Sequence, residues 1–113
     1  MKTINDINTE ISELQDRNPA KFKDTKEYKK AEKQAQLLRT CATYLQLNPT
    51  RDAMVKDLEL VEKKIKAAED GYSVWLTHTT FEEKGKNPKQ TYRAYMGIRN
   101  LELQRRSLQF LLS

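Results

Sequence analysis

The sequence predicts an all-α protein: an antiparallel bundle of three long helices, with a short N-terminal helix docked across it or exchanged with a partner chain. Glycine and proline number only three each among 113 residues, whereas Lys, Glu, Gln and Leu are plentiful. This composition favours helix over sheet. Apolar side chains also recur at helical spacing along most of the chain. A chain of this length has room for one core, so residues 1–113 are predicted to form a single helical domain.

The first helix is expected over residues 3–16. Four aliphatic side chains follow one another at steps of 3, 4 and 3 residues and form a single stripe on a polar helix: Ile4, Ile7, Ile11 and Leu14. A helix this short is only marginally stable in water, so the stripe must pack against another element. Pro19 ends the helix, because the residue before a proline is displaced from the α region.

The second helix is expected over residues 24–47, with a cap at Asp24 or Thr25. A row of lysines runs along its beginning at steps of 3, 4 and 3 residues: Lys23, Lys26, Lys30 and Lys33. The same row then continues with apolar residues, which widen the apolar arc of the second half: Leu37, Cys41 and Tyr44. An arc this wide is typical of a helix packed on two sides, so these three residues are predicted at an oligomer interface.

The third helix is expected over residues 50–76, after a short break at Asn48-Pro49. Seven apolar residues alternate at spacings of 4 and 3 over three heptads: Met54, Leu58, Val61, Ile65, Ala68, Tyr72 and Trp75. This stripe predicts a seam for another helix, and the short connection makes the second helix its antiparallel neighbour. Gly71 either ends the helix or is an internal glycine that costs about 1 kcal/mol relative to alanine. The stripe keeps its phase beyond Gly71, which favours a continuous helix.

A loop is expected over residues 77–88, where Thr79 or Thr80 could cap a short turn, and a fourth helix over residues 88–112 begins at Pro88. The fourth helix carries two apolar faces. Such a helix is buried between layers or lies at a subunit boundary, so its second face is predicted at an oligomer interface: Ile98, Leu101, Leu108 and Leu112.

Residues on both sides of the loop have the composition of a site for a small anionic ligand, such as a nucleotide: Trp75, His78, Thr79, Thr80, Tyr92, Arg93 and Arg99. Aromatic faces stack on bases, while hydroxyl groups and arginines hold phosphates. The alternative is structural. Trp75 would then end the core stripe, and Arg99 and Arg106 would pair with acids of the first helix at Asp6, Glu10 or Glu13.

The net charge of +5 is unevenly distributed. Residues 17–40 carry eight Lys or Arg against three acids, and residues 81–113 carry seven against three. The row from Lys23 to Lys33 could follow the phosphates of a nucleic acid with salt-sensitive affinity. The alternative is an ordinary solvated helix face, since no helix-turn-helix glycine turn, zinc finger or RNA-binding aromatic motif accompanies the row.

Catalysis, cofactors and metals are not expected. The chain has one histidine and one cysteine, too few for a zinc site of the usual kind, and it contains no phosphate loop, nucleophile elbow or dinucleotide fingerprint. Cys41 is interpreted as a small buried apolar residue. The absence of an N-terminal apolar segment and of any apolar run of 18 residues predicts a cytoplasmic protein that does not enter a membrane.

The leading functional prediction is a non-enzymatic interaction protein that forms a homo-oligomer and binds and regulates another macromolecule. A helix of 24 residues is about 36 Å long, so it exposes its sides unless a second copy or a partner protein covers them. In size and composition the chain is similar to the small helical accessory proteins that phages and mobile elements encode. Two alternatives remain: an oligomer that sequesters a small anionic ligand at a subunit boundary, and a protein that binds nucleic acid through a basic helix face.

Overall fold

The computed structural model describes residues 2–47 and 50–113, and every regular element within these ranges is a helix. The all-α prediction is therefore confirmed. In chain order the elements are α1 (Ile4–Arg17), the 3-10 turn η1 (Ala20–Phe22), α2 (Lys26–Leu47), α3 (Arg51–Asp70), α4 (Tyr72–His78), α5 (Phe81–Lys84), α6 (Pro88–Tyr95) and α7 (Ile98–Leu112). No helix among the described residues is long and apolar enough to cross a membrane.

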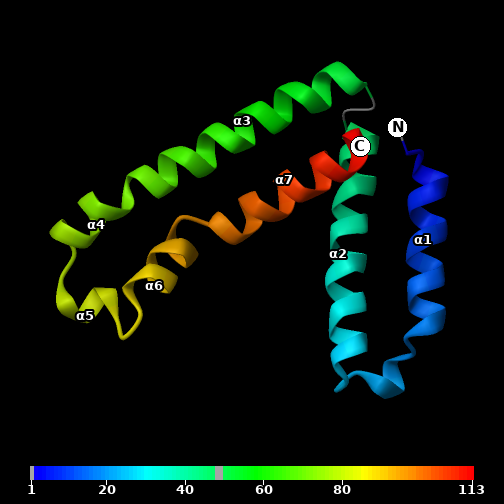
Figure 1. Ribbon diagram of the computed structural model, residues 1–113, viewed down its shortest axis with the longest axis horizontal. Helices are drawn as coiled ribbons and strands as arrows, with labels where there is room; N and C mark the ends of the chain where they lie inside the picture. Colours follow the sequence, from blue (N-terminus) through cyan, green and yellow to red (C-terminus); the bar gives the residue numbers. More distant parts are fainter. Residues whose placement is uncertain (1, 48–49) are drawn as a thin grey trace.

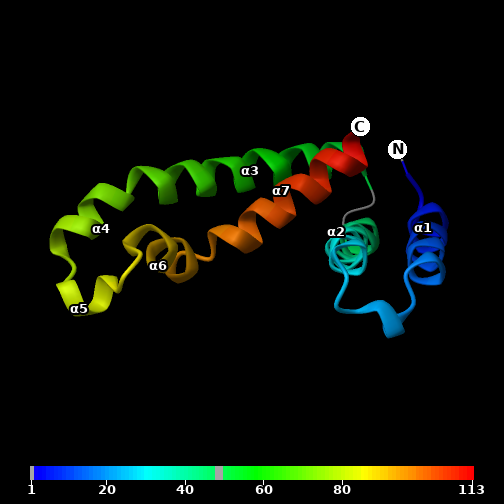
Figure 2. The same ribbon diagram turned by 60° about the horizontal axis from the view of Figure 1, so that its bottom comes forward.

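The helices form two arms that meet at a corner (Figures 1 and 2). One arm is the hairpin of α1 and α2, which lie side by side and antiparallel. The other arm is built on α3 and α7, which also pack antiparallel, with α4, α5 and α6 at its far end. The C-terminal part of α7 packs against α2 and joins the arms.

The predicted bundle of three antiparallel long helices is not confirmed, because α3 leaves the corner away from α2 and packs along α7. The sides of α2 that could receive α3 are occupied by α1 and by the end of α7. Asn48 and Pro49, on which the prediction of a short turn rested, lie outside the described residues.

Hydroxyl side chains begin several helices by accepting backbone N–H groups that have no partner within the helix. Thr3 and Asp6 form a reciprocal capping box: the Thr3 hydroxyl accepts from the Asp6 N–H at 3.2 Å, and the Asp6 carboxylate accepts from the Thr3 N–H at 3.1 Å. The bond from the Thr3 N–H, together with the side chain of Thr3, holds the pKa of the Asp6 carboxyl below its usual value. Thr25 accepts from the Tyr28 N–H at 3.2 Å, and Thr50 accepts from the Ala53 N–H at 3.3 Å.

The predicted third helix is interrupted at Gly71, which separates α3 from α4. The interruption is one residue long. Gly71 stays in the right-handed region at φ −80° and ψ −7°, its N–H donates to the Ala67 carbonyl at 3.1 Å, and its carbonyl accepts from the Trp75 N–H at 3.1 Å. The apolar stripe consequently continues in phase into α4, as its spacing predicted, although the helix itself does not.

The prediction of one continuous helix over residues 88–112 is wrong. The first part ends at Tyr95, and Gly97 has the left-handed φ of 64° before α7 begins at Ile98. Glycine enters this region without the steric penalty that a Cβ imposes, so the chain can turn sharply there. Within the expected loop over 77–88, Thr80 caps the short helix α5 by accepting from the Glu83 N–H at 3.3 Å.

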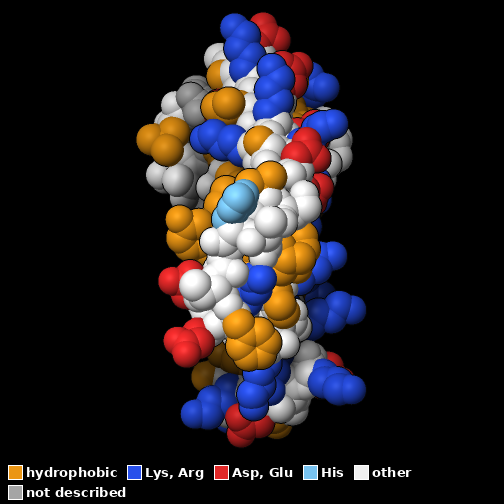
Figure 3. All heavy atoms as spheres, turned by 90° about the vertical axis from the view of Figure 1, so that its left-hand side faces the viewer, with side chains coloured by type: hydrophobic (Ala, Val, Ile, Leu, Met, Phe, Trp, Pro, Cys, Tyr) orange, Lys and Arg blue, Asp and Glu red, His pale blue; other side chains and the backbone are white. Residues whose placement is uncertain are grey.

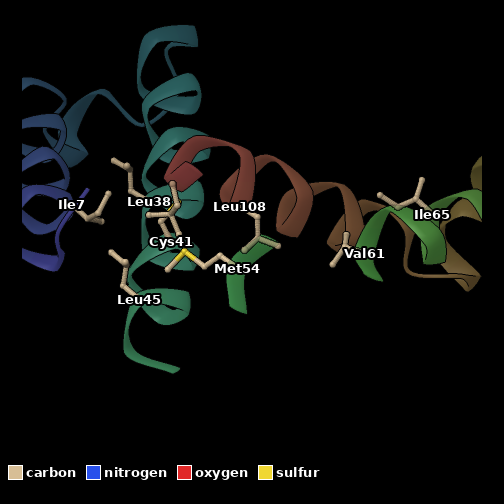
Figure 4. Packing of buried hydrophobic residues seen from close by; sticks show 9 residues of the cluster. Ile7, Leu38, Cys41, Leu45, Met54, Val61, Ile65 and Leu108 are labelled. Carbon is tan, nitrogen blue, oxygen red and sulfur yellow. The ribbon is translucent and has the colours of Figure 1, made fainter. Parts of the chain in front are cut away.

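The main core lies at the corner, where side chains from both arms meet (Figure 4). Its central residues come from four helices and are fully buried: Ile7, Leu38, Cys41, Met54 and Leu108. The cluster extends along the contact of α3 and α7 through Val61 and Ile65. A smaller second cluster lies in the far arm and consists of Ala68, Tyr92 and Ile98, with Tyr72 and Trp75 packed against it.

The molecule is open and thin. Its principal extents are 48 × 40 × 18 Å, and its radius of gyration is 17.3 Å. A compact domain of this chain length has a radius of gyration of about 13 Å. The accessible surface is 8221 Å², compared with roughly 6,500 Å² for a compact monomer of 13.3 kDa. One chain therefore exposes roughly 1,700 Å² more surface than its mass requires.

Candidate functional site

The structure divides the predicted ligand residues between two places. Trp75 and Tyr92 lie in the far arm, where they form an aromatic cluster with Tyr72. The ring centroids of Trp75 and Tyr92 are 5.1 Å apart, and those of Tyr72 and Tyr92 are 5.2 Å apart. The Tyr92 hydroxyl donates to the Ala68 carbonyl of α3. These rings contact one another, which is the arrangement expected of a small core.

The other predicted ligand residues near the loop have separate surroundings. His78 is exposed at the end of α4, Thr79 follows it and is half-buried, and Thr80 is engaged as the cap of α5. Arg93 forms an ion pair with Glu102 of α7, with 2.6 Å between Nη2 and Oε1. Tyr92 and Arg93 line one cavity of about 410 Å³ together with Lys89, and the other predicted ligand residues near the loop are not among those that line it.

Arg99 lies instead on the wall of a cleft of about 370 Å³ between α2 and α7. The two helices diverge from the corner (Figure 1), and the residues that line the cleft come from both of them. Four cationic side chains line it, two from each helix: Lys30, Lys33, Arg99 and Arg106. The structure therefore combines half of the predicted lysine row with the predicted ligand residue Arg99. We call this feature the corner cleft.

The electrostatics of the corner cleft are strongly positive. Glu102 is the one acidic residue among those that line it, and Arg93 already neutralises its carboxylate. Arg99 and Arg106 form no ion pair within residues 2–47 and 50–113, where the pairs found are Lys2 with Glu10 and Arg93 with Glu102. The alternative that these arginines pair with acids of the first helix is thus not what the described residues show.

The rest of the lysine row lies outside the corner cleft. Lys23 follows η1, Lys26 is the first residue of α2, and both are exposed. Of the acids that interrupt the row in sequence, Glu32 lines a groove on the side of α2 that packs against α1, whereas Glu27 lines a groove together with Lys30 and Gln34. The lysines therefore run from the start of α2 into the corner cleft with one carboxylate, that of Glu27, beside Lys30.

Most residues predicted at an oligomer interface are used within one chain. Cys41 and Leu108 are 0% exposed, and Ile98 is 1% exposed. Leu37, Tyr44, Leu101 and Leu112 are half-buried against the same core. Cys41 of α2 and Leu108 of α7 belong to the same corner cluster, whereas Ile98 packs in the far-arm cluster with Ala68 and Tyr92. The Cys41 thiol donates to the Ser107 carbonyl at 3.5 Å, and the Ser107 hydroxyl donates to the Leu103 carbonyl at 2.8 Å.

Much of the exposed apolar surface lies at the far end of the other arm, which Figure 3 views end on, while Phe22, Leu47 and Leu60 are exposed elsewhere. Hydrophobic side chains are visible there between charged ones, and four large ones are exposed: Val74, Phe81, Tyr95 and Met96. Their exposed fractions are 61%, 88%, 76% and 39%, respectively. Sequence reasoning missed them. The available signal was that Val74 falls outside the phase of the stripe through Tyr72 and Trp75. We call these four residues the far-arm patch.

The chemistry available to the described residues is limited. No group of three or more His, Cys, Asp or Glu side chains among them is placed to hold a metal ion. Burial raises the pKa of the Cys41 thiol to about 11, so at neutral pH it is protonated and a poor nucleophile. Comparison of the chain with protein-family models, with curated proteins and with solved structures finds no match. Any functional conclusion therefore depends on the corner cleft and the far-arm patch.

Proposed function

We propose that this protein is a non-enzymatic helical interaction protein, that it works as a homo-oligomer and that it binds another macromolecule in the cytoplasm. The observation that carries the proposal is the surface that one chain leaves uncovered, roughly 1,700 Å² more than a compact monomer of its mass exposes. Burying apolar surface is the main driving force for association, and monomeric proteins rarely keep a large apolar patch open.

The far-arm patch is the surface that we assign to the contact between copies. Its four side chains come from α4, α5, the end of α6 and the turn after it. Met96 also lines an adjoining groove between α3 and α7, together with Ala67, Ala68 and Leu101. The patch thus offers both protruding apolar side chains and an apolar groove. A two-fold axis through this region would let each copy place its side chains in the groove of the other.

The excess surface of one chain, taken as a whole, is comparable in size with one side of a dimer interface. If each of two copies covered its excess surface, the interface would bury roughly 3,400 Å² in total, within the 2,000–5,000 Å² typical of obligate dimers. A standard interface needs about 800 Å² from each partner, so even half of the excess would suffice. The corner cleft adjoins this groove, since Asn100 lines both, but none of the four cationic side chains of the cleft lines the groove.

A small-ligand oligomer is the weaker candidate. Its predicted aromatic residues, Trp75 and Tyr92, already contact each other and Tyr72, and Arg93 is paired with Glu102. A bound nucleotide would have to separate these contacts before it could stack on a ring face.

Sedimentation equilibrium tests the proposal. Wild-type protein at micromolar concentration is expected to have twice the chain mass of 13.3 kDa. The variant with Val74→Asp and Tyr95→Asp should be a monomer, because both changes place a charge in the far-arm patch. The matched control is Phe22→Asp with Leu47→Asp, which alters two exposed apolar residues of the other arm and should remain a dimer. A monomeric wild-type protein would contradict the proposal.

A further inference from the structure

We infer that the corner cleft binds the phosphate backbone of a nucleic acid without reading its bases. The inference deepens the proposed function, because it names the macromolecule that is bound. It rests on one part of that function, the binding of another macromolecule. It does not require self-association, which the sedimentation experiment measures separately.

The arrangement of positive charge is the first observation. Lys30 and Lys33 lie on α2, and Arg99 and Arg106 lie two turns apart on α7, so both walls of the corner cleft are basic. Lys26 extends the α2 wall outward, and from Lys26 to Lys33 it runs for about 10 Å of helix. The arginines span about 10 Å as well. Each wall is long enough to accompany two successive phosphates of a strand.

The other residues that line the cleft are also suited to phosphate. Gln34, Gln36 and Asn100 carry side-chain amides, which donate hydrogen bonds to phosphate oxygens and sugars. Leu37 and Leu103 are the only apolar residues among those that line it. A protein partner is normally held by a desolvated apolar centre with few charges. A nucleic-acid backbone is held mainly by the release of counterions, which needs charge and not apolar area.

The absence of aromatic residues from the cleft lining decides between backbone and base recognition. Proteins that bind unpaired bases stack them on Phe, Tyr, Trp or His, and the aromatic side chains of the far arm are used in their own cluster. The row of lysines also continues beyond the cleft toward the start of α2, which suits a polymer better than a single phosphorylated molecule. We therefore expect binding that depends weakly on sequence and strongly on salt.

Fluorescence anisotropy with a labelled single strand of mixed sequence, about 20 nucleotides long, tests the inference. At about 50 mM salt the wild-type protein should bind the strand, with an affinity that falls steeply as salt rises. The variant with Arg99→Glu and Arg106→Glu should bind at least 10-fold more weakly. The matched control is Lys63→Glu with Lys66→Glu on the exposed side of α3, which lowers the net charge from +5 to +1 in the same way. Its affinity should fall by less than 3-fold.

A second variant covers the case in which charge reversal disturbs folding. Arg99→Gln with Arg106→Gln keeps long polar side chains, and it should weaken binding and reduce the slope of log affinity against log salt by about 1.4. Equal losses in the cleft variant and the α3 control would overturn the inference, because they would show attraction to overall charge. Failure of the wild-type protein to bind any strand would overturn it as well. Displacement of the strand by polyglutamate at equal charge concentration would assign the cleft to an acidic protein segment instead.

Discussion

The corner and the far arm are both built from amphipathic helices, yet they bury their apolar residues to different extents. At the corner, aliphatic side chains from α1, α2, α3 and α7 interlock, and Ile7, Leu38, Met54 and Leu108 are each 0% exposed. In the far arm the cluster is smaller and aromatic, and large apolar side chains such as Phe81 remain outside it. The corner buries most of its apolar residues within one chain, whereas the far arm leaves large apolar side chains exposed, and these are the side chains that we propose a second copy covers.

The lengths of the helices explain part of this difference. The far-arm helices α4, α5 and α6 have 7, 4 and 8 residues, and helices this short have little stability of their own. They are held by the rings of Tyr72, Trp75 and Tyr92 and by the hydrogen bond from Tyr92 to Ala68. The far arm should therefore open at lower free energy than the corner.

Truncation of a corner residue should have the largest effect on stability. Leu108→Ala removes a fully buried side chain and should lower the free energy of unfolding by about 3 kcal/mol. Phe81→Ala in the far arm removes a side chain that is 88% exposed, and it should change the free energy of unfolding of the monomer by less than about 0.5 kcal/mol. Urea denaturation of both variants at low protein concentration measures the difference. Equal losses would mean that the two regions are packed alike.

The buried thiol of the corner should make folding sensitive to alkaline pH. Burial raises the pKa of Cys41 from 9.0 to about 11. Between these values the unfolded chain releases the proton and the folded chain keeps it, so stability falls as pH rises. The loss should be roughly 2 kcal/mol between pH 9 and 11, since one pKa unit corresponds to about 1.4 kcal/mol.

The control for this prediction is Cys41→Ala, which should be less stable at neutral pH but should lose less stability over the same alkaline range. Burial also raises the pKa of Tyr44, so some alkaline loss remains in the variant. Denaturant melts at several pH values provide the comparison. Identical slopes in the two proteins would show that the thiol is not buried in the way described.

A double-mutant cycle at Gly71 and Tyr92 examines the far-arm cluster. Tyr92→Phe removes the hydrogen bond to Ala68 and should cost about 1 kcal/mol. A Cβ at Gly71 would lie 3.0 Å from the Tyr92 hydroxyl oxygen, whereas the φ and ψ of Gly71 suit alanine. Gly71→Ala should thus stabilise the Tyr92→Phe protein by about 0.5–1 kcal/mol and the wild-type protein by less. Additive effects in thermal or urea melts would exclude the contact.

The smallest effect is expected at the cap of α5. Thr80→Ala removes the acceptor for the Glu83 N–H and should weaken α5 by about 0.5–1 kcal/mol. Because α5 is a short helix of the far arm, its amides should exchange faster with deuterium while the global melting temperature hardly changes. A large shift in melting temperature would mean that α5 unfolds together with the corner.

The positions of the helices can be predicted from the sequence more accurately than which helices pack against each other. The starts and ends of α1 and α2 lie within two residues of their predicted positions, because caps and breakers are local signals. The stripe along α3 correctly marks a buried face, but periodicity does not say which helix covers it. The break at Gly97 was missed because Met96 and Ile98 both belong to apolar faces, and the left-handed φ of Gly97 depends on the pairing of α7 with α3.

The corner cleft could be predicted only in part. Lys30 and Lys33 were candidates as a helix face, and Arg99 was a candidate for a different ligand. These residues are separated by more than half of the chain, and only the crossing of α7 over α2 brings them together. The far-arm patch could not be predicted either, because the second face of α7 is divided between the corner, which takes Leu108, and the far-arm cluster, which takes Ile98.

Small-angle X-ray scattering over a concentration series tests most directly the claim that each chain has an open shape and that a second copy covers its far-arm patch. For a dimer we expect a scattering mass of twice 13.3 kDa at high concentration, with a radius of gyration above the 17.3 Å of one chain. The far-arm variant with Val74→Asp and Tyr95→Asp should keep the mass of one chain and an open shape. A wild-type mass of one chain at every concentration would contradict the claim that a second copy completes the chain, and a radius of gyration near the roughly 13 Å of a compact domain would contradict its open shape.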